Sequence, residues 1–402
     1  MSEKRRDQKG RVLHTGESQR KDGRYAFKYT DVSGEVKFVY SWRLDVNDKL
    51  PSGKRACESL RELEREIAKK LDGGISPSAG KITILELAKK HIQLKGNVSY
   101  STRQHYYAIL NLIANDSFAT VRIDKLRPSD AKAWLLRLYE AGKGPPTLSS
   151  LCSFMRQAYN LAIEDDLIQK NPFSFKFGDV IKQTTHTRVG LTNEQEAAFL
   201  EFIKSDRTYA KYYDPIFVLL NTGLRISEFC GLTIQDIHFD EMYIDVNKQL
   251  LLYMGNTYHA VPPKTNSGVR RVPMTTDVAG ALRAIIEKRK VCETEMVIDG
   301  YSGFIMLART GKPFVAIRWD ALFDSISKKY NELHKKDPLK VTPHICRHTF
   351  CTKMVRAGIN PKMLQYIMGH GDISVTYNTY THISPEDARD EMLRVSSQAS
   401  AT

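Results

Sequence analysis

The stretch TPHICRHTF, residues 342–350, says the most about the fold of this chain. Thr342 can accept hydrogen bonds as a helix N-cap, and Pro343 suits the first helical position, where a missing N–H costs nothing. In the helix that follows, His344 and Arg347 are three residues apart and therefore share one face. That face lies near a helix N-terminus, whose free N–H groups favour an anion. Taken alone, the pattern also fits a surface helix with an unrelated histidine and arginine.

A second arginine lies at another expected helix start. Gly223 follows a helical run and predicts a turn, which would present Arg225 at the beginning of the next helix. The planar guanidinium fork of an arginine can bond two oxygens of one phosphate, and it stays charged at any working pH. By itself, an arginine between two helices is more often an ordinary ion-pair partner.

Further short motifs occur in the second half of the chain. They are TGLRISE at residues 222–228, PKT at 263–265, LQYIMGH at 364–370 and YNTYTH at 377–382. Together with TPHICRHTF, they resemble the tyrosine recombinase (phage integrase) family, and most of all the integrases of conjugative transposons, also called integrative and conjugative elements. The family motifs span residues 191–385, and the general layout of such integrases covers the whole chain.

The resemblance implies an active site that cuts and rejoins DNA by transesterification, with no metal, cofactor or ATP. Tyr380 would be the nucleophile that forms a 3′-phosphotyrosyl link, and Lys264 the general acid for the departing 5′ oxygen. Paired guanidinium groups would stabilise the extra charge of the pentacovalent phosphorane, which is preorganised electrostatic help worth several kcal/mol. Two histidines would orient the tyrosine or accept its proton. The implied catalytic set is Arg225, Lys264, His344, Arg347, His370 and Tyr380.

The nucleophile has an alternative. Tyr380 lies one residue further from His370 than the tyrosine of many relatives, and Tyr377 is the other candidate. We prefer Tyr380 because Tyr380, Thr381 and His382 match the tyrosine-x-histidine ending of the family. A phenol is a weak nucleophile near neutral pH, so either tyrosine needs a base or flanking cations.

The lysine also has an alternative interpretation. Lys264 lies in the segment VPPKTNSG, residues 261–268, between the strand-like runs 249–253 and 269–273. This placement predicts the tip of a hairpin. A solvated turn lysine is the default for such a position, whereas the resemblance makes it a proton donor that desolvation beside DNA would favour.

The composition favours a polyanionic partner. The 402 residues carry a formal net charge of +14, which favours nucleic acid, although a merely soluble basic protein is the alternative. Six cysteines without a C-x-x-C spacing give no sign of a zinc knuckle or a redox pair and fit reduced thiols. The N-terminus lacks the apolar run of a signal peptide, and no stretch is apolar enough to span a bilayer, so we expect a cytoplasmic protein.

The length and the breaks in composition predict a multidomain protein. We expect an N-terminal α+β domain at residues 1–72, with a small antiparallel sheet and one helix. A central all-α helical bundle follows at 82–173, and then a mainly-α catalytic domain with a small antiparallel sheet at 191–395. The polar, basic stretch 174–190 is expected to be a linker.

Several side chains of the N-terminal domain are candidates for DNA contacts. Aromatic runs at 24–29 and 36–40, joined by the turn signal DVSG, predict two strands, and the run 10–14 predicts a third. A strand pair can enter a DNA major groove. A half-buried hairpin with lysines on its wet side explains the same pattern. The candidates are Arg24, Lys28, Lys37, Tyr40 and Trp42, with Arg103 in the helical bundle.

The resemblance implies partners as well. The N-terminal sheet would bind arm-type repeats, and the central and catalytic domains would grip a core-type site of double-stranded DNA. Recombination would take place in a dimer or tetramer on DNA, with an excisionase and a host DNA-bending protein, and without a membrane. The alternatives are a type IB-like topoisomerase and a non-catalytic DNA-binding regulator. A metal-dependent nuclease is more distant, because no carboxylate cluster at ligand spacing stands out.

Overall fold

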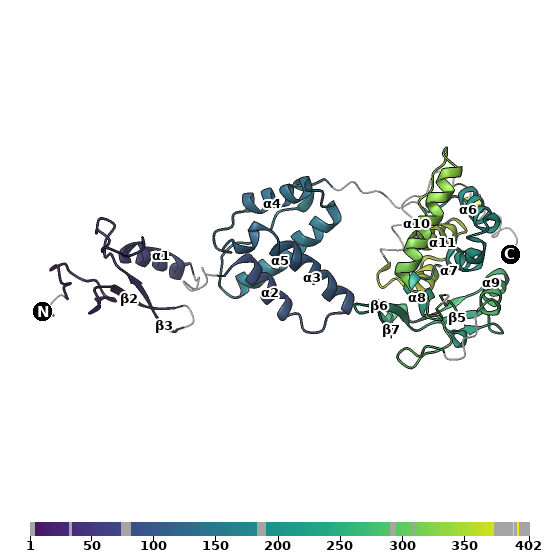
Figure 1. Ribbon diagram of the computed structural model, residues 1–402, viewed down its shortest axis with the longest axis horizontal. Coiled ribbons are helices and arrows are strands. Elements are labelled where there is room, and N and C mark those ends of the chain that lie inside the picture. The colour runs from purple at the N-terminus through teal and green to yellow at the C-terminus, as the bar shows by residue number, and fades with distance from the viewer. Residues whose placement is uncertain are drawn as a thin grey trace. The chain divides into compact units, whose positions relative to one another are not determined.

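The chain forms two compact units, residues 1–185 and 186–402 (Figure 1). The computed structural model describes residues 5–31, 34–73, 82–182, 190–289, 295–308 and 310–373, together with 389, 392 and 393. None of the helices in these described ranges combines the length and the apolar character of a membrane span. The observed elements confirm the predicted fold class: a small antiparallel sheet with a helix, a helical bundle, and a mainly helical part with small sheets.

The N-terminal part is a three-stranded antiparallel sheet with one helix. Ser59 and Glu62 form a capping box that starts the helix, and Leu60 packs into a small core with Tyr25 and Leu44. The order in the sheet is β1-β2-β3. The elements are β1 (Glu17–Gln19), β2 (Tyr25–Thr30), β3 (Val36–Ser41) and α1 (Leu60–Asp72).

The outer strand of this sheet corrects the prediction. The sequence indicated residues 10–14, but the strand that pairs with β2 is β1, and Val12 forms only an isolated bridge with Arg6. Gly16, with a φ of 90°, turns the chain after residue 14, so pairing with β2 begins at Glu17. Strand pairing depends on this turn rather than on the apolar character of the preceding run.

Four helices form the core of the central bundle. Thr83 and Glu86 form a capping box at the start of the first of these helices. Trp134, Tyr159 and Phe173 are buried between the helices and pack ring against ring. The helices are α2 (Ile84–Gln93), α3 (Tyr100–Ala114), α4 (Pro128–Glu140) and α5 (Pro145–Glu164).

We predicted a linker from residue 174 onwards. The structure corrects this prediction, because the stretch directly after the bundle packs against it. Phe175 packs against the core of the bundle, and Ile181 is buried in it. Arg156 of α5 donates hydrogen bonds to the carbonyl oxygens of Phe173 and Phe175, at 2.8 Å each. The single basic residue of α5 therefore anchors the polypeptide that follows the bundle.

The second unit is built from helices with two small antiparallel sheets. One sheet has the strand order β4-β5-β8, and β6 and β7 form a separate hairpin. The helices are α6 (Asn193–Ser205), α7 (Tyr213–Thr222), α8 (Ile226–Gly231), α9 (Thr276–Glu287), α10 (Ala316–Leu333), α11 (Pro343–Arg356) and α12 (Pro361–Met368). The strands are β4 (Ile237–His238), β5 (Tyr243–Val246), β6 (Gln249–Tyr253), β7 (Thr257–Val261) and β8 (Arg270–Pro273).

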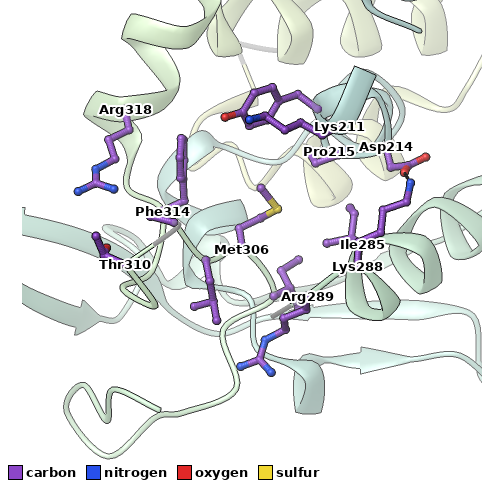
Figure 2. A pocket seen from close by; sticks show the side chains of 14 residues that line it. Lys211, Asp214, Pro215, Ile285, Lys288, Arg289, Met306, Thr310, Phe314 and Arg318 are labelled. Atoms are coloured by element: carbon purple, nitrogen blue, oxygen red, sulfur yellow. Dashed lines mark hydrogen bonds and ion pairs between the residues drawn. The ribbon is translucent and has the colours of Figure 1, made fainter. Parts of the chain in front are cut away.

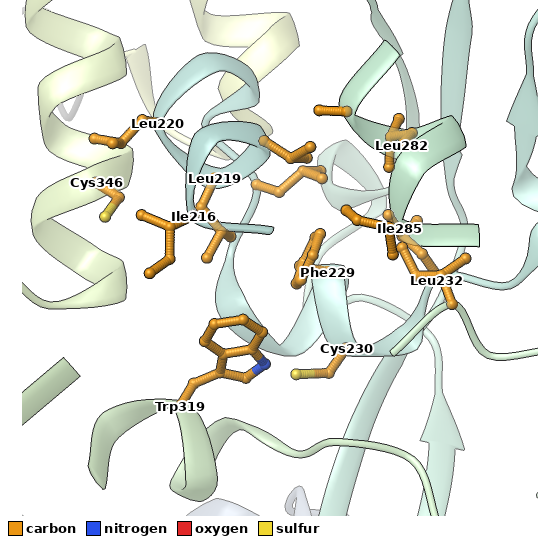
Figure 3. Close-up of a cluster of buried hydrophobic side chains, with 14 of the residues drawn as sticks. Ile216, Leu219, Leu220, Phe229, Cys230, Leu232, Leu282, Ile285, Trp319 and Cys346 are labelled. Atoms are coloured by element: carbon orange, nitrogen blue, oxygen red, sulfur yellow. The ribbon is translucent and has the colours of Figure 1, made fainter. Parts of the chain in front are cut away.

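Helix α7 is the centre of this unit. It is apolar on most sides and packs against α9 and α11, as expected for a buried helix. Figure 3 shows Ile216 and Leu219 of α7 facing Phe229 of α8 and Trp319 of α10. The Phe229 and Trp319 rings meet edge to face, with centroids 5.8 Å apart. This core fixes the end of α7, from which Arg225 follows.

Lys264 is not at the tip of a hairpin, which corrects the prediction. The sequence missed β7, so the run after β6 looked like one long connection. The hairpin is formed by β6 and β7, and its turn lies at residues 254–256. Lys264 lies in the connection from β7 to β8, which belong to different sheets.

Candidate active site

Arg225 lies where α7 ends and α8 begins. Gly223 ends α7 in the left-handed conformation, with a φ of 65°, and a methyl group there would lie 2.5 Å from Cδ1 of Phe350. Arg225 follows as the N-cap residue of α8. Its Nη1 donates to Oε1 of Glu228 at 2.6 Å, and its Nη2 donates to the carbonyl oxygen of Gly369 at 2.9 Å. The guanidinium is thus held from two sides.

Arg347 approaches the same place from α11. Its Nη1 donates to the carbonyl oxygen of Gly223 at 2.6 Å, and its Nη2 donates to that of Met368 at 2.5 Å. Only 5% of the residue is exposed. Burial lowers the pKa of the Arg347 guanidinium, and the positive charge of Arg225 lowers it further. The group still carries its proton at neutral pH.

The two arginines therefore converge on one turn of the chain. They bind the consecutive carbonyl oxygens of Met368 and Gly369, and His370 is the next residue. Burial, followed by the charges of Arg347 and Arg225, lowers the pKa of His370 to about 4. At neutral pH His370 is an uncharged imidazole beside two guanidinium groups. An anion bound here would lie beside two guanidinium cations and one neutral imidazole that can accept or donate a proton.

Two residues outside the predicted catalytic set lie at the centre of this arrangement. Glu228 is 2% exposed and binds Arg225, while its Oε2 also accepts from Nη2 of Arg270 at 3.0 Å. Burial alone would raise the pKa of Glu228, but the hydrogen bonds and charge of Arg270, together with those of Arg225, outweigh it and lower the pKa. The spacing of Arg225 and Glu228, typical of a capping box, was the signal for Glu228. Strand alternation was the signal for Arg270, because it shares a face with buried Val272.

The loop that carries Lys264 lies against the same turn. Lys264 itself is exposed. A methyl group at Gly369 would lie 3.0 Å from the carbonyl oxygen of Ser267, and one at Gly371 would lie 3.8 Å from Cγ2 of Thr265. Residues that follow Lys264 are thus in contact range of the residues on either side of His370.

His344 is exposed at the start of α11, one turn before Arg347. Thr342 caps this helix by accepting a hydrogen bond from the backbone N–H of Ile345, as the sequence predicted. Tyr380 and the alternative Tyr377 lie outside the described residues.

The candidate DNA contacts of the N-terminal sheet fall on two faces. Lys28 and Tyr40 share the open face, where Lys28 pairs with Phe38 across the strands. The guanidinium of Arg24 lies over the rings of Tyr40 and Trp42, at 5.5 and 5.7 Å from their centroids. Lys37 does not join this group.

Lys37 lies on the opposite face, at the strand position paired with Tyr29. Its Nζ binds the buried carboxylate of Asp31 at 2.9 Å. Arg103 is exposed on α3 of the bundle.

Among the described residues, one group of side chains has the spacing of a metal site, and it lies in the N-terminal sheet domain. It consists of His14, Glu17 and Glu64, whose potential ligand atoms are within 4.8 Å of one another. Arg61 already neutralises Glu17 at 2.9 Å. Burial raises the pKa of Glu64 to about 7, and the neighbouring Glu17 adds to this. The trio is more readily explained as a carboxyl pair that shares a proton.

A cavity of about 670 Å³ lies elsewhere in the second unit, between the start of α7, the end of α9 and the segment 305–314 (Figure 2). Apolar side chains such as Met306 and Phe314 line it, and Lys288 pairs with Asp214 at its edge, at 2.7 Å. None of the predicted catalytic residues that the structure describes lines this cavity.

Comparison with known proteins gives matches along nearly the whole chain. Residues 190–387 match the model of the phage integrase family, and residues 1–71 match that of the DNA binding domain of Tn916 integrase. The transposase from transposon Tn916 of Enterococcus faecalis is 42% identical over 398 residues, which cover 99% of this chain and 98% of that protein. The transposase from transposon Tn1545 of Streptococcus pneumoniae is 42% identical with the same coverage.

A solved structure gives a similar result. The Tn1549 transposon integrase (residues 82–397 of its own chain), in complex with a circular intermediate DNA, is 41% identical, with a TM-score of 0.74. The match covers 78% of this chain and 99% of that one.

Proposed function

Since the chain belongs to the phage integrase family, the tyrosine recombinases, we propose that it is the enzyme that excises and integrates a conjugative transposon. It recombines DNA at specific sites, and its substrate is double-stranded DNA. The resemblance to transposases of Tn916 and Tn1545 over 99% of the chain supports a mobile element as the context.

One observation carries the proposed chemistry: the guanidinium groups of Arg225 and Arg347 converge on the consecutive carbonyl groups before His370. A scissile phosphate bound there would face two fixed cations. They would stabilise the additional negative charge that develops on the non-bridging oxygens as the phosphorus becomes five-coordinate. Because both groups are already fixed by hydrogen bonds, little reorganisation is needed when the charge appears.

The proposed bond changes use the roles that the family resemblance implies. The phenolic oxygen of Tyr380 attacks the phosphorus, and the bond from phosphorus to the 5′ oxygen breaks. Lys264 gives a proton to the departing 5′ oxygen. The phenolic proton is lost to a base, for which neutral His370 and the exposed His344 are the candidates. The 3′-phosphotyrosyl link conserves the bond energy, so the reverse attack by a 5′ hydroxyl rejoins the strand.

The DNA contacts are assigned by domain. We place arm-type binding on the open face of the N-terminal sheet, with Arg24, Lys28, Tyr40 and Trp42. Core-type binding falls to the bundle, where Arg103 is exposed, and to the second unit. Strand exchange requires two to four copies on DNA, with an excisionase and a host DNA-bending protein. The relatives are bacterial, so the reaction takes place in the cytoplasm, where bacterial DNA lies.

A nicked suicide duplex carrying the end of the transposon that encodes the chain tests this function. The nick lets the cleaved fragment diffuse away, so a covalent protein–DNA adduct accumulates on a denaturing gel. Wild-type protein should form the adduct in EDTA, Tyr380→Phe should not, and Tyr377→Phe should resemble wild type. An adduct that persists in Tyr380→Phe and is lost in Tyr377→Phe would assign the nucleophile to the other tyrosine.

The alternative functions give different outcomes in related assays. A topoisomerase of type IB relaxes supercoiled plasmid without a specific site, whereas we expect products only with two transposon ends. A DNA-binding regulator would bind the duplex and form no adduct.

A further inference from the structure

We propose that Arg270 is a positioning residue that holds the Lys264 loop, residues 263–268, against the phosphate site. This inference rests on the proposed function. The side chain of Arg270 is 0% exposed. Its guanidinium donates to the carbonyl oxygen of Gly268 at 3.0 Å and to that of Ile367 at 2.6 Å, and it binds Glu228 at 3.0 Å. One side chain thus joins the loop, the end of α12 and the carboxylate that binds Arg225.

The Lys264 loop is held together by contacts between its own residues. The N–H of Gly268 donates to the carbonyl oxygen of Thr265 at 2.8 Å. A methyl group at Gly268 would lie only 2.4 Å from Cβ of Pro263, so the two ends of the loop are in contact. Lys264 stands between Pro263 and Thr265. A residue that fixes Gly268 therefore fixes the base of the loop from which the lysine extends.

Arg270 also fixes the surface against which the loop lies. Its Nε binds the carbonyl group of Ile367, three residues before His370, while Ser267 and Thr265 of the loop face Gly369 and Gly371. The distance between the lysine and the phosphate site consequently depends in part on this planar group, which reaches both the loop and the end of α12.

The position of the Arg225 side chain depends less on Arg270 than the position of the Lys264 loop does. Its backbone N–H and Nη1 both bind Glu228, and its Nη2 binds Gly369. A lysine at position 270 would keep a positive charge beside Glu228, but its compact ammonium group cannot reach all three partners of the guanidinium fork. Arg270→Lys should therefore displace the Lys264 loop and leave Arg225 in place.

The test is a double-mutant cycle with the full chain. Single-turnover rates of adduct formation are measured on the nicked transposon-end duplex for Arg270→Lys, Lys264→Ala and the double variant. We expect Arg270→Lys to be slower by about 10²-fold, the loss that a misplacement of about 1 Å causes. The double variant should match Lys264→Ala within about twofold, because Arg270 acts through the lysine.

The matched control is Arg271→Lys. Arg271 is the next residue on β8, faces the other way with a 65% exposed side chain, and lies 3.4 Å from Asp245. The Arg271→Lys variant should cleave the duplex at the wild-type rate. Gly268→Ala approaches the same contact from the loop, since its methyl group collides with Pro263. It keeps Arg270 intact and should reproduce the loss seen in Arg270→Lys, even if Arg270→Lys itself folds poorly.

A chemical readout separates positioning from a general loss of structure. In a duplex whose scissile bridging 5′ oxygen is replaced by sulfur, the thiolate leaves without a proton. Arg270→Lys and Lys264→Ala should both recover most of their rate on this duplex, and Arg225→Ala should not. Equal losses on oxygen and sulfur, losses that multiply in the double variant, or a wild-type rate for Arg270→Lys would overturn the inference. A wild-type chain that forms no adduct would instead end the proposed function.

Discussion

His370 is an imidazole whose protonation is set first by its burial and then by the cations around it. Burial, followed by the charges of Arg347 and Arg225, lowers its pKa from 6.5 to about 4. As the pH falls below 6.5, the unfolded chain takes up this proton before the folded chain does. His370 therefore contributes stability that is complete above pH 6.5 and is lost as the pH falls toward 4.

We expect the ring of His370 to stay neutral down to about pH 5, well below the ordinary histidine range. The measurement is a histidine NMR titration of the full chain labelled with ¹⁵N, with the His370 signal assigned from the spectrum of His370→Asn. A signal that titrates with a midpoint near 6.5 would mean that the ring is solvated and remote from both arginines.

The sequence was informative about some residues of this site and not others. Arg225 and Arg347 lie beside a glycine and a helix cap, which are local signals, and the structure brings both to one turn. Strand alternation places Arg270 on the face of Val272 and Arg271 on the other face, but the motifs of the site do not include this strand, and packing makes the first face the buried one. The site thus contains a cation that its motifs did not reveal.

At the scale of elements, the backbone conformation at the end of α12 determines the turn at residues 368–370, which the two arginines bind. Gly369 has a φ of 61°, and a methyl group there would lie 2.9 Å from Nη1 of Arg270 and 3.0 Å from the carbonyl oxygen of Ser267. Gly369→Ala should lower the free energy of unfolding by about 1–2 kcal/mol from backbone strain alone, and more from the collision. It should also slow adduct formation.

Gly280 supplies the opposite control. It lies inside α9 and has no neighbour within 4 Å of an added methyl group. Gly280→Ala should raise the free energy of unfolding by about 0.5–1 kcal/mol and leave cleavage unchanged. Urea unfolding followed by circular dichroism gives both energies. Equal effects of the two substitutions would show that the turn at Gly369 is not constrained.

Helices were easier to predict than strands. A cap such as Thr342 and a terminal glycine such as Gly223 are local signals, and they marked the start of α11 and the end of α7 correctly. Strands β1 and β7 were missed, because a strand of three to five residues is defined by its partner across the sheet rather than by its own sequence.

The two faces of the N-terminal sheet give a prediction with a built-in control. Lys28 lies on the open face with Tyr40, and Lys37 lies on the other face, bound to buried Asp31. Lys28→Ala should weaken binding of the full chain to the arm-type repeats and reduce the salt slope of log K by about 1.

Lys37→Ala should leave the salt slope of that binding unchanged, although it should lower stability because the ion pair between Lys37 and the buried Asp31 is lost. Fluorescence anisotropy across a salt series measures both variants. A larger loss of affinity for Lys37→Ala than for Lys28→Ala would move the DNA-binding surface to the opposite face.

At the scale of the whole molecule, each part has its own core. The buried residues of the sheet domain, including Leu44 and Leu60, form one cluster, and those of the bundle, including Trp134, form another. The described catalytic candidates all belong to the unit of residues 186–402, whose core surrounds Trp319. Folding of the catalytic unit should therefore not need the N-terminal sheet.

This separation predicts that a chain lacking residues 1–81 keeps DNA cleavage but loses binding to the arm-type repeats. It should form the covalent adduct on a core-type suicide duplex at close to the full-length rate, because Arg225, Arg347 and Glu228 keep all their contacts. It should lose specific binding to the arm-type repeats and excise the transposon poorly in cells. Denaturing gels, anisotropy and an excision assay measure the three effects. A truncated chain that is folded and binds core DNA, yet forms no adduct, would show that the N-terminal domain contributes to the chemistry itself.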